Sequence, residues 1–204
     1  MRDFNPLLLR LLRSFTTLFV GGACIGLLHQ YDLAAAGVLL VIGSLISWST
    51  YKTRPTFARG FILICGTILT GALGSLVELW GIKNGYWSYN GLTDGRNFPA
   101  WLPFAWGFAF VALYRIEEFC IHFLGLRTLK DKIVLAVTLS AILPTWGEII
   151  AINFGVWNYS WDYQMFGVPL LAVPLLVVFH VGIYSLFSFI CHRHRLQDPV
   201  FGRI

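Results

Sequence analysis

Two glutamates and the aromatic residues that follow them are the side chains whose types and spacing could do chemistry. Glu78 and Glu148 are each followed by glycine after seven residues, by tryptophan after nine and by tyrosine after eleven. The aromatic residues are Trp87, Tyr89, Trp157 and Tyr159. A carboxyl group inside a helix bundle is desolvated, which favours the protonated form that can donate a proton. Glu78 and Glu148 are therefore the candidate catalytic acid and base.

The same residues have a second interpretation, which the sequence leaves open. Each glutamate lies near the end of an apolar segment, where a carboxylate can reach water, and tryptophan and tyrosine are common at membrane interfaces. In that case the aromatic residues form an ordinary belt. The interior position is favoured because a belt does not require a fixed distance between an acid and its aromatic residues.

A second polar set lies within another apolar segment and comprises Arg115, Glu117, Glu118 and His122. On a helix Arg115, Glu118 and His122 share one face at positions i, i+3 and i+7, whereas Glu117 points about 100° away. Three interpretations stay open for this set. It is a self-neutralised cluster near the headgroups, a second acid–base site, or a buried ion pair that holds two helices together.

Two more residues join the candidate substrate-binding set of Trp87, Tyr89, Trp157 and Tyr159. Trp106 lies at the level of the other tryptophans, and His180 lies in the middle of the last apolar segment. A lone membrane histidine usually hydrogen-bonds a neighbouring side chain, so this is the other interpretation of His180. The aspartates Asp32, Asp94 and Asp162 are expected to be solvated loop residues.

Membrane helices are the elements that must position these side chains. Of 204 residues, 57% are hydrophobic and only 12% are charged, against about 25% charged in a soluble domain. This composition excludes disorder and argues against a soluble fold. Six apolar segments have the roughly 20 residues needed to cross a bilayer. They cover approximately residues 14–30, 33–50, 60–82, 100–125, 132–154 and 167–191.

The basic residues predict the orientation of these segments. Twelve lysines and arginines lie at the N-terminus, in the tail and in the two links on that side, and only Lys83 and Arg96 lie on the other side. By the positive-inside rule both termini are expected in the cytoplasm of a cell, or inner, membrane. Topology and anionic headgroups therefore account for the net charge of +5, and no nucleic acid partner is expected.

The chain contains an internal repeat with an offset of 70 residues. Segments 60–127 and 130–197 form the two copies, and residues 1–59 supply two further spans. Each copy holds two spans, so we expect a parallel repeat about an axis along the membrane normal. Gly85 and Gly155 fit helix ends, and Pro99 and Pro169 fit the first turn of the next helix. The matched positions are Glu78/Glu148, Ile82/Ile152, Gly85/Gly155, Trp87/Trp157, Tyr89/Tyr159 and Pro99/Pro169.

Signatures of other chemistries are missing from the sequence. There is no nucleophile elbow, phosphate loop, dinucleotide fingerprint or zinc-protease motif. The four cysteines lack metal-ligand spacing and are expected to pack between helices. We therefore expect neither a metal nor a cofactor.

The carboxylate–aromatic motif resembles membrane proteins of carotenoid biosynthesis. Residues 78–89 and 99–106 are similar to carotenoid hydratases. Residues 155–159, 167–169 and 173–175 are similar to the small bacterial-type lycopene cyclase domains. The paired acids of those cyclases are replaced here, because Leu175 and Leu176 follow Pro174.

The resemblance implies an enzyme that needs no cofactor and protonates a C=C bond of a lipid-soluble polyene or terpenoid. The resulting cation would be stabilised by aromatic faces and would then lose a proton or capture water, giving cyclisation, isomerisation or hydration. Two other functions stay open. One is a small transporter or lipid-binding carrier whose two carboxylates couple proton flow, and the other is a non-catalytic membrane assembly protein. The partners expected are the apolar substrate and membrane lipids.

Overall fold

The computed structural model describes residues 5–92, 95–96 and 98–202, and it confirms an all-helical architecture with six helices. Four very short strands lie in the connections. The helices are α1 (Asn5–Leu28), α2 (Asp32–Thr53), α3 (Phe57–Lys83), α4 (Leu102–Leu124), α5 (Leu129–Asn153) and α6 (Ala172–His194). The strands are β1 (Trp87–Tyr89), β2 (Trp157–Tyr159), β3 (Gln164–Met165) and β4 (Val168–Pro169).

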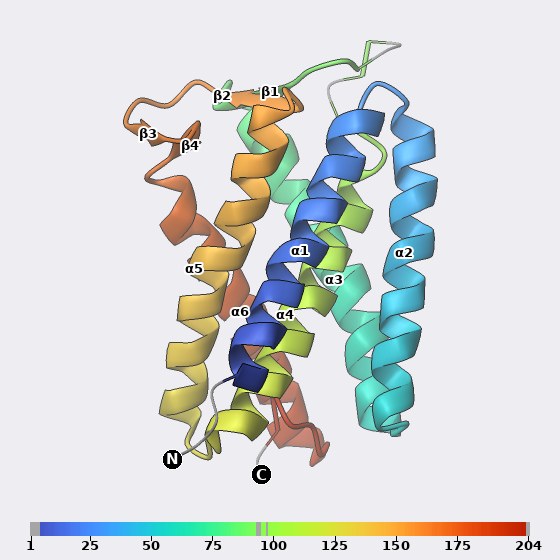
Figure 1. Cartoon of the computed structure of the whole chain (residues 1–204), viewed down its shortest axis with the longest axis vertical. Coiled ribbons are helices and arrows are strands. Elements are labelled where there is room, and N and C mark those ends of the chain that lie inside the picture. Colours follow the sequence, from blue (N-terminus) through green and yellow to red (C-terminus); the bar gives the residue numbers. More distant parts are fainter. Residues whose placement is uncertain (1–4, 93–94, 97, 203–204) are drawn as a thin grey trace.

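Five of the described helices, all except α4, are long and apolar enough to cross a membrane. α4 has 23 residues but carries Arg115, Glu117 and Glu118. Figure 1 shows the helices running side by side, with the chain termini at one end and β1, β2 and the α1–α2 turn at the other. Many large apolar side chains on the outer faces of α1, α2 and α3 are exposed, as expected of helices that face lipid.

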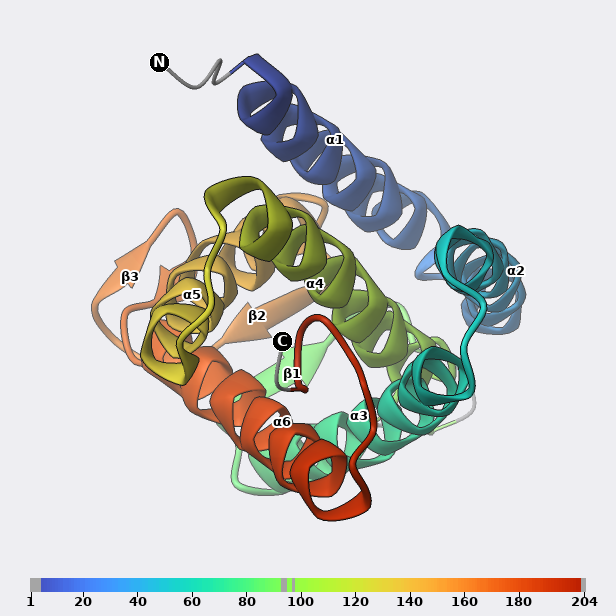
Figure 2. The ribbon, with the colours of Figure 1, turned by 90° about the horizontal axis from the view of Figure 1, so that it is seen from below.

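Helices α3 to α6 form a ring, and α1 and α2 pack outside it against α4 and α5 (Figure 2). The closest pair in the ring is α3 with α4, and glycines explain this approach. A Cβ atom on Gly66 or Gly74 would lie within 2.5 Å of the Phe110 or Trp106 ring. Small residues at a helix interface let the backbones come close, which replaces the hydrophobic driving force that lipid removes.

The two copies of the repeat are related by a pseudo-twofold axis that passes through β1 and β2. The strands pair antiparallel, Trp87 with Tyr159, Ser88 with Asn158, and Tyr89 with Trp157. Under the offset of 70 residues Trp87 corresponds to Trp157 and Tyr89 to Tyr159. The first and third pairs are therefore exchanged, as a twofold axis requires. Gly85 and Gly155 both have φ of 71°, a left-handed conformation that glycine adopts without strain. Each glycine turns the end of α3 or α5 into its strand.

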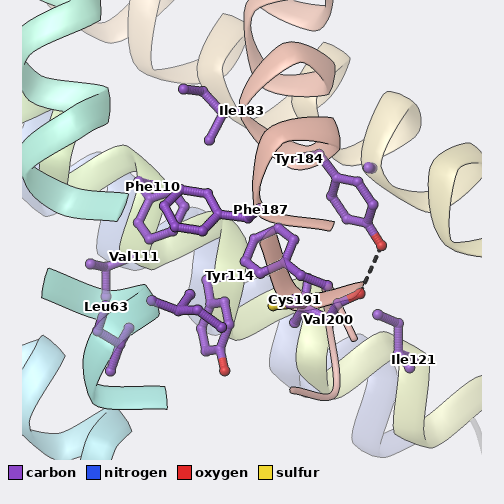
Figure 3. Close-up of a cluster of buried hydrophobic side chains, with 13 residues drawn as sticks. Leu63, Phe110, Val111, Tyr114, Ile121, Ile183, Tyr184, Phe187, Cys191 and Val200 are labelled. Atoms are coloured by element: carbon purple, nitrogen blue, oxygen red, sulfur yellow. Dashed lines mark hydrogen bonds between the residues drawn. The ribbon is translucent and has the colours of Figure 1, made fainter. Parts of the chain in front are cut away.

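The segment after α6 folds back into the end of the ring that is opposite the strands. Phe201 packs among Phe110, Tyr114 and Phe187, and Figure 3 shows the Tyr184 hydroxyl donating to the Val200 carbonyl. Asp198 is buried and accepts from the Tyr114 hydroxyl at 2.8 Å. The Lys132 ammonium donates to the carbonyls of Pro199 and Gly202. Residues 196–202 therefore complete the core between the helices.

Three sequence predictions need correction. Asp32 is buried rather than solvated, and its carboxylate accepts from Arg96 at 2.6 Å and from the Ala100 backbone N–H at 2.7 Å. Pro99 and Pro169 precede their helices by three residues, so neither occupies a first helical turn. Pro99 instead lies in the connection between β1 and α4, and Pro169 ends β4 in the connection between β2 and α6. Asp162 is exposed as expected, and Asp94 lies outside the described residues.

We expect Asp32→Ala to destabilise the protein by about 2 kcal/mol. The substitution leaves the Ala100 N–H without its acceptor and removes one ion-pair partner of the partly exposed Arg96. Thermal unfolding of the purified protein in detergent measures this change. Asp162→Ala, which removes an exposed aspartate near the same end, should leave the unfolding temperature unchanged. Equal stabilities of the two variants would contradict the role given to Asp32.

Candidate functional site

Glu78 projects from the last turns of α3 toward three hydrogen-bond donors. Its Oε2 atom accepts from the Trp87 indole at 2.7 Å and from the Tyr89 hydroxyl at 2.9 Å. Its Oε1 atom accepts from the Trp106 indole at 3.3 Å. Trp87 and Tyr89 can both reach the same carboxylate because alternate residues of a strand point to one side. The short strand thus acts as a clamp over the glutamate.

Glu148 occupies the equivalent place on α5 but has a poorer set of donors. Its Oε2 atom accepts from the Tyr159 hydroxyl at 2.8 Å, and the Trp157 indole is a further hydrogen-bonding neighbour. Leu176 takes the position that Trp106 holds in the first copy, so the third donor is lost. Glu78 is therefore better prepared to hold a negative charge, and Glu148 is better prepared to hold a proton.

Both carboxyl groups line one small cavity of about 130 Å³ between the helices. All six helices and the strands β1 and β2 contribute to its wall, and most of the wall is apolar. Among the described lining residues, Tyr89 is the only titratable group besides the two glutamates. The volume is close to that of the roughly 150 Å³ cavity that holds benzene in an engineered protein. Lining residues include Gly22, Leu39, Trp101, Ala105, Phe108, Pro144, Gly147 and Ala151.

Tyr89 and Tyr159 stay hydrogen-bond donors over the whole physiological pH range. Burial, and next the neighbouring glutamate of the same copy, raise the pKa of each phenol well above 10. Ionised phenolate would be desolvated and would face a carboxylate, so the neutral form is strongly favoured. The two hydroxyls therefore stabilise the glutamates without taking part in proton exchange near neutral pH.

The aromatic rings pack around the axis in crossed pairs. Trp87 contacts Tyr159, and Tyr89 contacts Trp157, with ring centroids 5.6 Å apart in each pair. Trp101 extends this wall, stacks on Trp157, and is almost fully buried. Its indole N–H has no hydrogen-bond partner in the described part of the chain, although it lines the cavity. A ligand oxygen or a water molecule in the cavity would satisfy this donor.

No role is predicted for Trp101 from the sequence, although the tryptophan lies at the level of the other aromatic residues. Its position is set by the connection before α4, where the Trp101 carbonyl accepts from the N–H groups of Phe104 and Ala105. Its proximity to the second copy depends on the pairing of the strands. The only signal in the sequence is the high density of tryptophan near Pro99, which does not distinguish a cavity wall from a membrane belt.

The second polar set does not form one site. Glu118 makes an ion pair with Arg59 of α3, and that arginine is almost completely buried. His122 is exposed at the end of α4, and its Nδ1 atom bonds the carbonyl of Glu118 on its own helix. Arg115 lines a separate cavity that faces α1. Of the three interpretations of this set, the buried ion pair between two helices describes Glu118. Its partner, Arg59, could not be identified from the spacing of residues in the sequence.

Glu117 and His180 form a buried contact between α4 and α6, at 2.7 Å between Oε1 and Nε2. The pseudo-twofold relates this pair to Phe187 and Phe110, whose rings are also in contact. Polar and aromatic contacts therefore occupy equivalent places on opposite sides of the axis. Neither residue lines the cavity of Glu78 and Glu148. The contact with Glu117 matches the interpretation of His180 as a histidine that bonds a neighbouring side chain, and its part in substrate binding stays a prediction.

Comparison with known proteins adds no assignment: no protein-family model, no curated protein and no solved structure matches this chain.

The fit between Trp87 and Gly81 gives a test of the clamp over Glu78. A Cβ atom on Gly81 would lie about 1.9 Å from the Trp87 ring, whereas the second copy has Ala151 at the equivalent position. We expect Gly81→Ala to push the indole away from Glu78 and to cost about 1–3 kcal/mol of stability. Thermal unfolding in detergent measures the loss.

Two matched variants make this result specific. Gly182→Ala adds a methyl group to α6 where nothing lies within 4 Å, and should have little effect. In a Trp87→Ala background, the cost of Gly81→Ala should almost disappear, because the two residues act through one contact. If the cost stayed the same in that background, the clamp would not be the cause.

Proposed function

We propose that this protein is an integral membrane enzyme that protonates a C=C bond of a lipid-soluble polyene or terpenoid. The observation that carries the proposal is the pair of glutamates that share one apolar cavity beneath an aromatic wall. Two carboxyl groups with unequal sets of donors suit an acid and a base in the same reaction. The resemblance of the motif to carotenoid hydratases and small lycopene cyclase domains points to the same chemistry.

In the proposed mechanism Glu148 is the acid and Glu78 is the base. Glu148 transfers its proton to one carbon of the double bond, forming a C–H bond and leaving a carbocation on the other carbon. Trp157, Trp101 and Tyr89 line the cavity and present rings to this cation, an interaction worth roughly 2 kcal/mol or more when desolvated. The cation then bonds to a second C=C of the substrate or to water. Glu78 takes the proton that is released, which restores the total charge.

The size of the cavity supports a substrate that enters only with its end. A volume of about 130 Å³ holds a terminal isoprenoid ring or unit, but not a long polyene. A larger groove of about 550 Å³ lies between α2, α3 and α4 and shares Leu39 and Phe108 with the cavity. The rest of an apolar chain fits this groove, which is reached from the hydrocarbon layer. The site would then lie near the outer face, with both chain termini in the cytoplasm.

A proton-coupled carrier is the second candidate, because two acids related by a pseudo-twofold axis also suit alternating protonation. The cavity of Glu78 and Glu148 lies near one end of the bundle. A carrier needs a path to both membrane faces, so this position favours the enzyme. Proton-dependent uptake of an apolar compound into liposomes, without chemical change, would favour the carrier. An assembly protein would tolerate replacement of both glutamates.

The test is the product pattern of cells that express the protein together with pathways for polyene or terpenoid precursors. Extracted lipids are separated by chromatography and detected by mass, and the growth medium contains D2O. We expect one compound to change retention at equal mass, or to gain the mass of water. One additional deuterium on carbon is expected, because the proton of Glu148 exchanges with solvent before transfer.

The variants assign the roles. Glu148→Gln should abolish the product, Glu78→Gln should lower it by about 100-fold or more, and both proteins should still insert. Asp162→Asn, which neutralises an exposed acid on the same side, is the control with full activity. Wild-type product formation by both glutamine variants would refute the proposed function.

A further inference from the structure

A second cavity, distinct from the acid cavity, lies between α1 and α4 toward the end of the bundle that holds the termini. Its volume is about 560 Å³, and three arginines line it, Arg10, Arg13 and Arg115. α1 presents a polar face to it, because Arg10, Ser14 and Thr17 recur with helical spacing. α4 contributes Arg115 beside the apolar side chains of Phe108 and Ala112.

Glu118, on the same helix as Arg115, offsets only part of the positive charge of this cavity. In the described part of the chain the ion pairs join Arg59 to Glu118, Arg96 to Asp32 and His180 to Glu117, and none involves the three cavity arginines. Arg10 and Arg115 are close enough to repel each other. Arg10 also lies over the Phe119 ring, 5.5 Å from its centroid. Like charges held close together on a partly desolvated surface are costly unless an anion joins them.

The apolar part of the cavity continues toward the acid cavity. Leu18, Phe108 and Leu143 line both spaces. From Arg115 to Ala105, which lines the acid cavity, α4 rises about 15 Å. A ligand that fits this shape has a compact anionic group at one end and a flexible apolar chain at the other. Arginine is suited to the anionic end because its planar donors bind phosphate oxygens in pairs.

We propose that this cavity binds an anionic membrane phospholipid. Its phosphate lies among Arg10, Arg13 and Arg115, and one acyl chain lies along Leu18, Phe108 and Leu143. The phosphate-binding part of the site does not depend on the reaction proposed for Glu78 and Glu148, because its arginines all lie outside that cavity. A free phosphate ion would leave the apolar part of the cavity empty, so the lipid is the better occupant.

The experiment measures lipid binding to the purified full chain in detergent by native mass spectrometry, with phosphatidylglycerol and phosphatidylcholine as probes. We expect phosphatidylglycerol to bind at least about tenfold more tightly. Arg115→Gln should weaken its binding by about tenfold or more, because each charge-assisted hydrogen bond to phosphate is lost from a partly desolvated site. Arg13→Gln, an exposed residue on α1, should act in the same direction and is a safer variant for folding.

The control is Arg193→Gln, which removes one positive charge near the same end of the bundle but from an exposed position on α6. It should leave the affinity for phosphatidylglycerol unchanged. Equal binding of the two lipids, or equal losses in Arg193→Gln and Arg13→Gln, would overturn the proposal. Displacement of the lipid by millimolar inorganic phosphate would show an anion site without the acyl chain, which would also overturn it.

Discussion

The antiparallel pairing of β1 with β2 is the interaction on which the acid cavity depends. Three residues per strand are too few to form a stable ribbon alone, so the pairing is held by the helix ends beneath it. Gly85 and Gly155 turn the chain from helix to strand with the same φ of 71°. Trp87 and Tyr89 then reach Glu78, while their rings contact the aromatic residues of the other copy. A buried carboxylate in a membrane protein needs donors from the protein itself, and this ladder supplies them for both copies.

Duplication produced two similar halves, and a few substitutions made them unequal. Trp106 in the first copy corresponds to Leu176 in the second, and Gly81 corresponds to Ala151. The first difference leaves Glu78 with one more donor than Glu148. The buried contact between Glu117 and His180 likewise has an aromatic counterpart in Phe187 and Phe110. The pseudo-twofold axis therefore relates the backbones closely, while the chemistry of the side chains on its two sides differs.

Structural features that depend on residues close together in the sequence could be predicted. Long apolar runs predict the helices, and the offset of 70 residues predicts the relation between the copies. The alternation of Trp87 and Tyr89 predicts that both face one side. Features with distant partners were not predictable, since no local pattern connects Glu118 with Arg59 or Asp32 with Arg96. The folding of residues 196–202 into the ring is of the same kind, because a seven-residue segment with only three large apolar side chains has no distinctive pattern. Both the proton transfer and the bond that would receive the proton stay proposals, because the motif names side chains and not a substrate.

The two ends of the ring are closed by segments far apart in the chain, which has a consequence for the order of biosynthesis. β1 emerges from the ribosome about 70 residues before its partner β2, and Lys132 emerges before the carbonyls of residues 199–202 that it bonds. Helices insert into the membrane successively during synthesis, so α3 and α4 are in place while Glu78 still lacks its completed surroundings. The acid cavity is therefore a late product of assembly, which arises when the second copy docks on the first rather than when either copy folds.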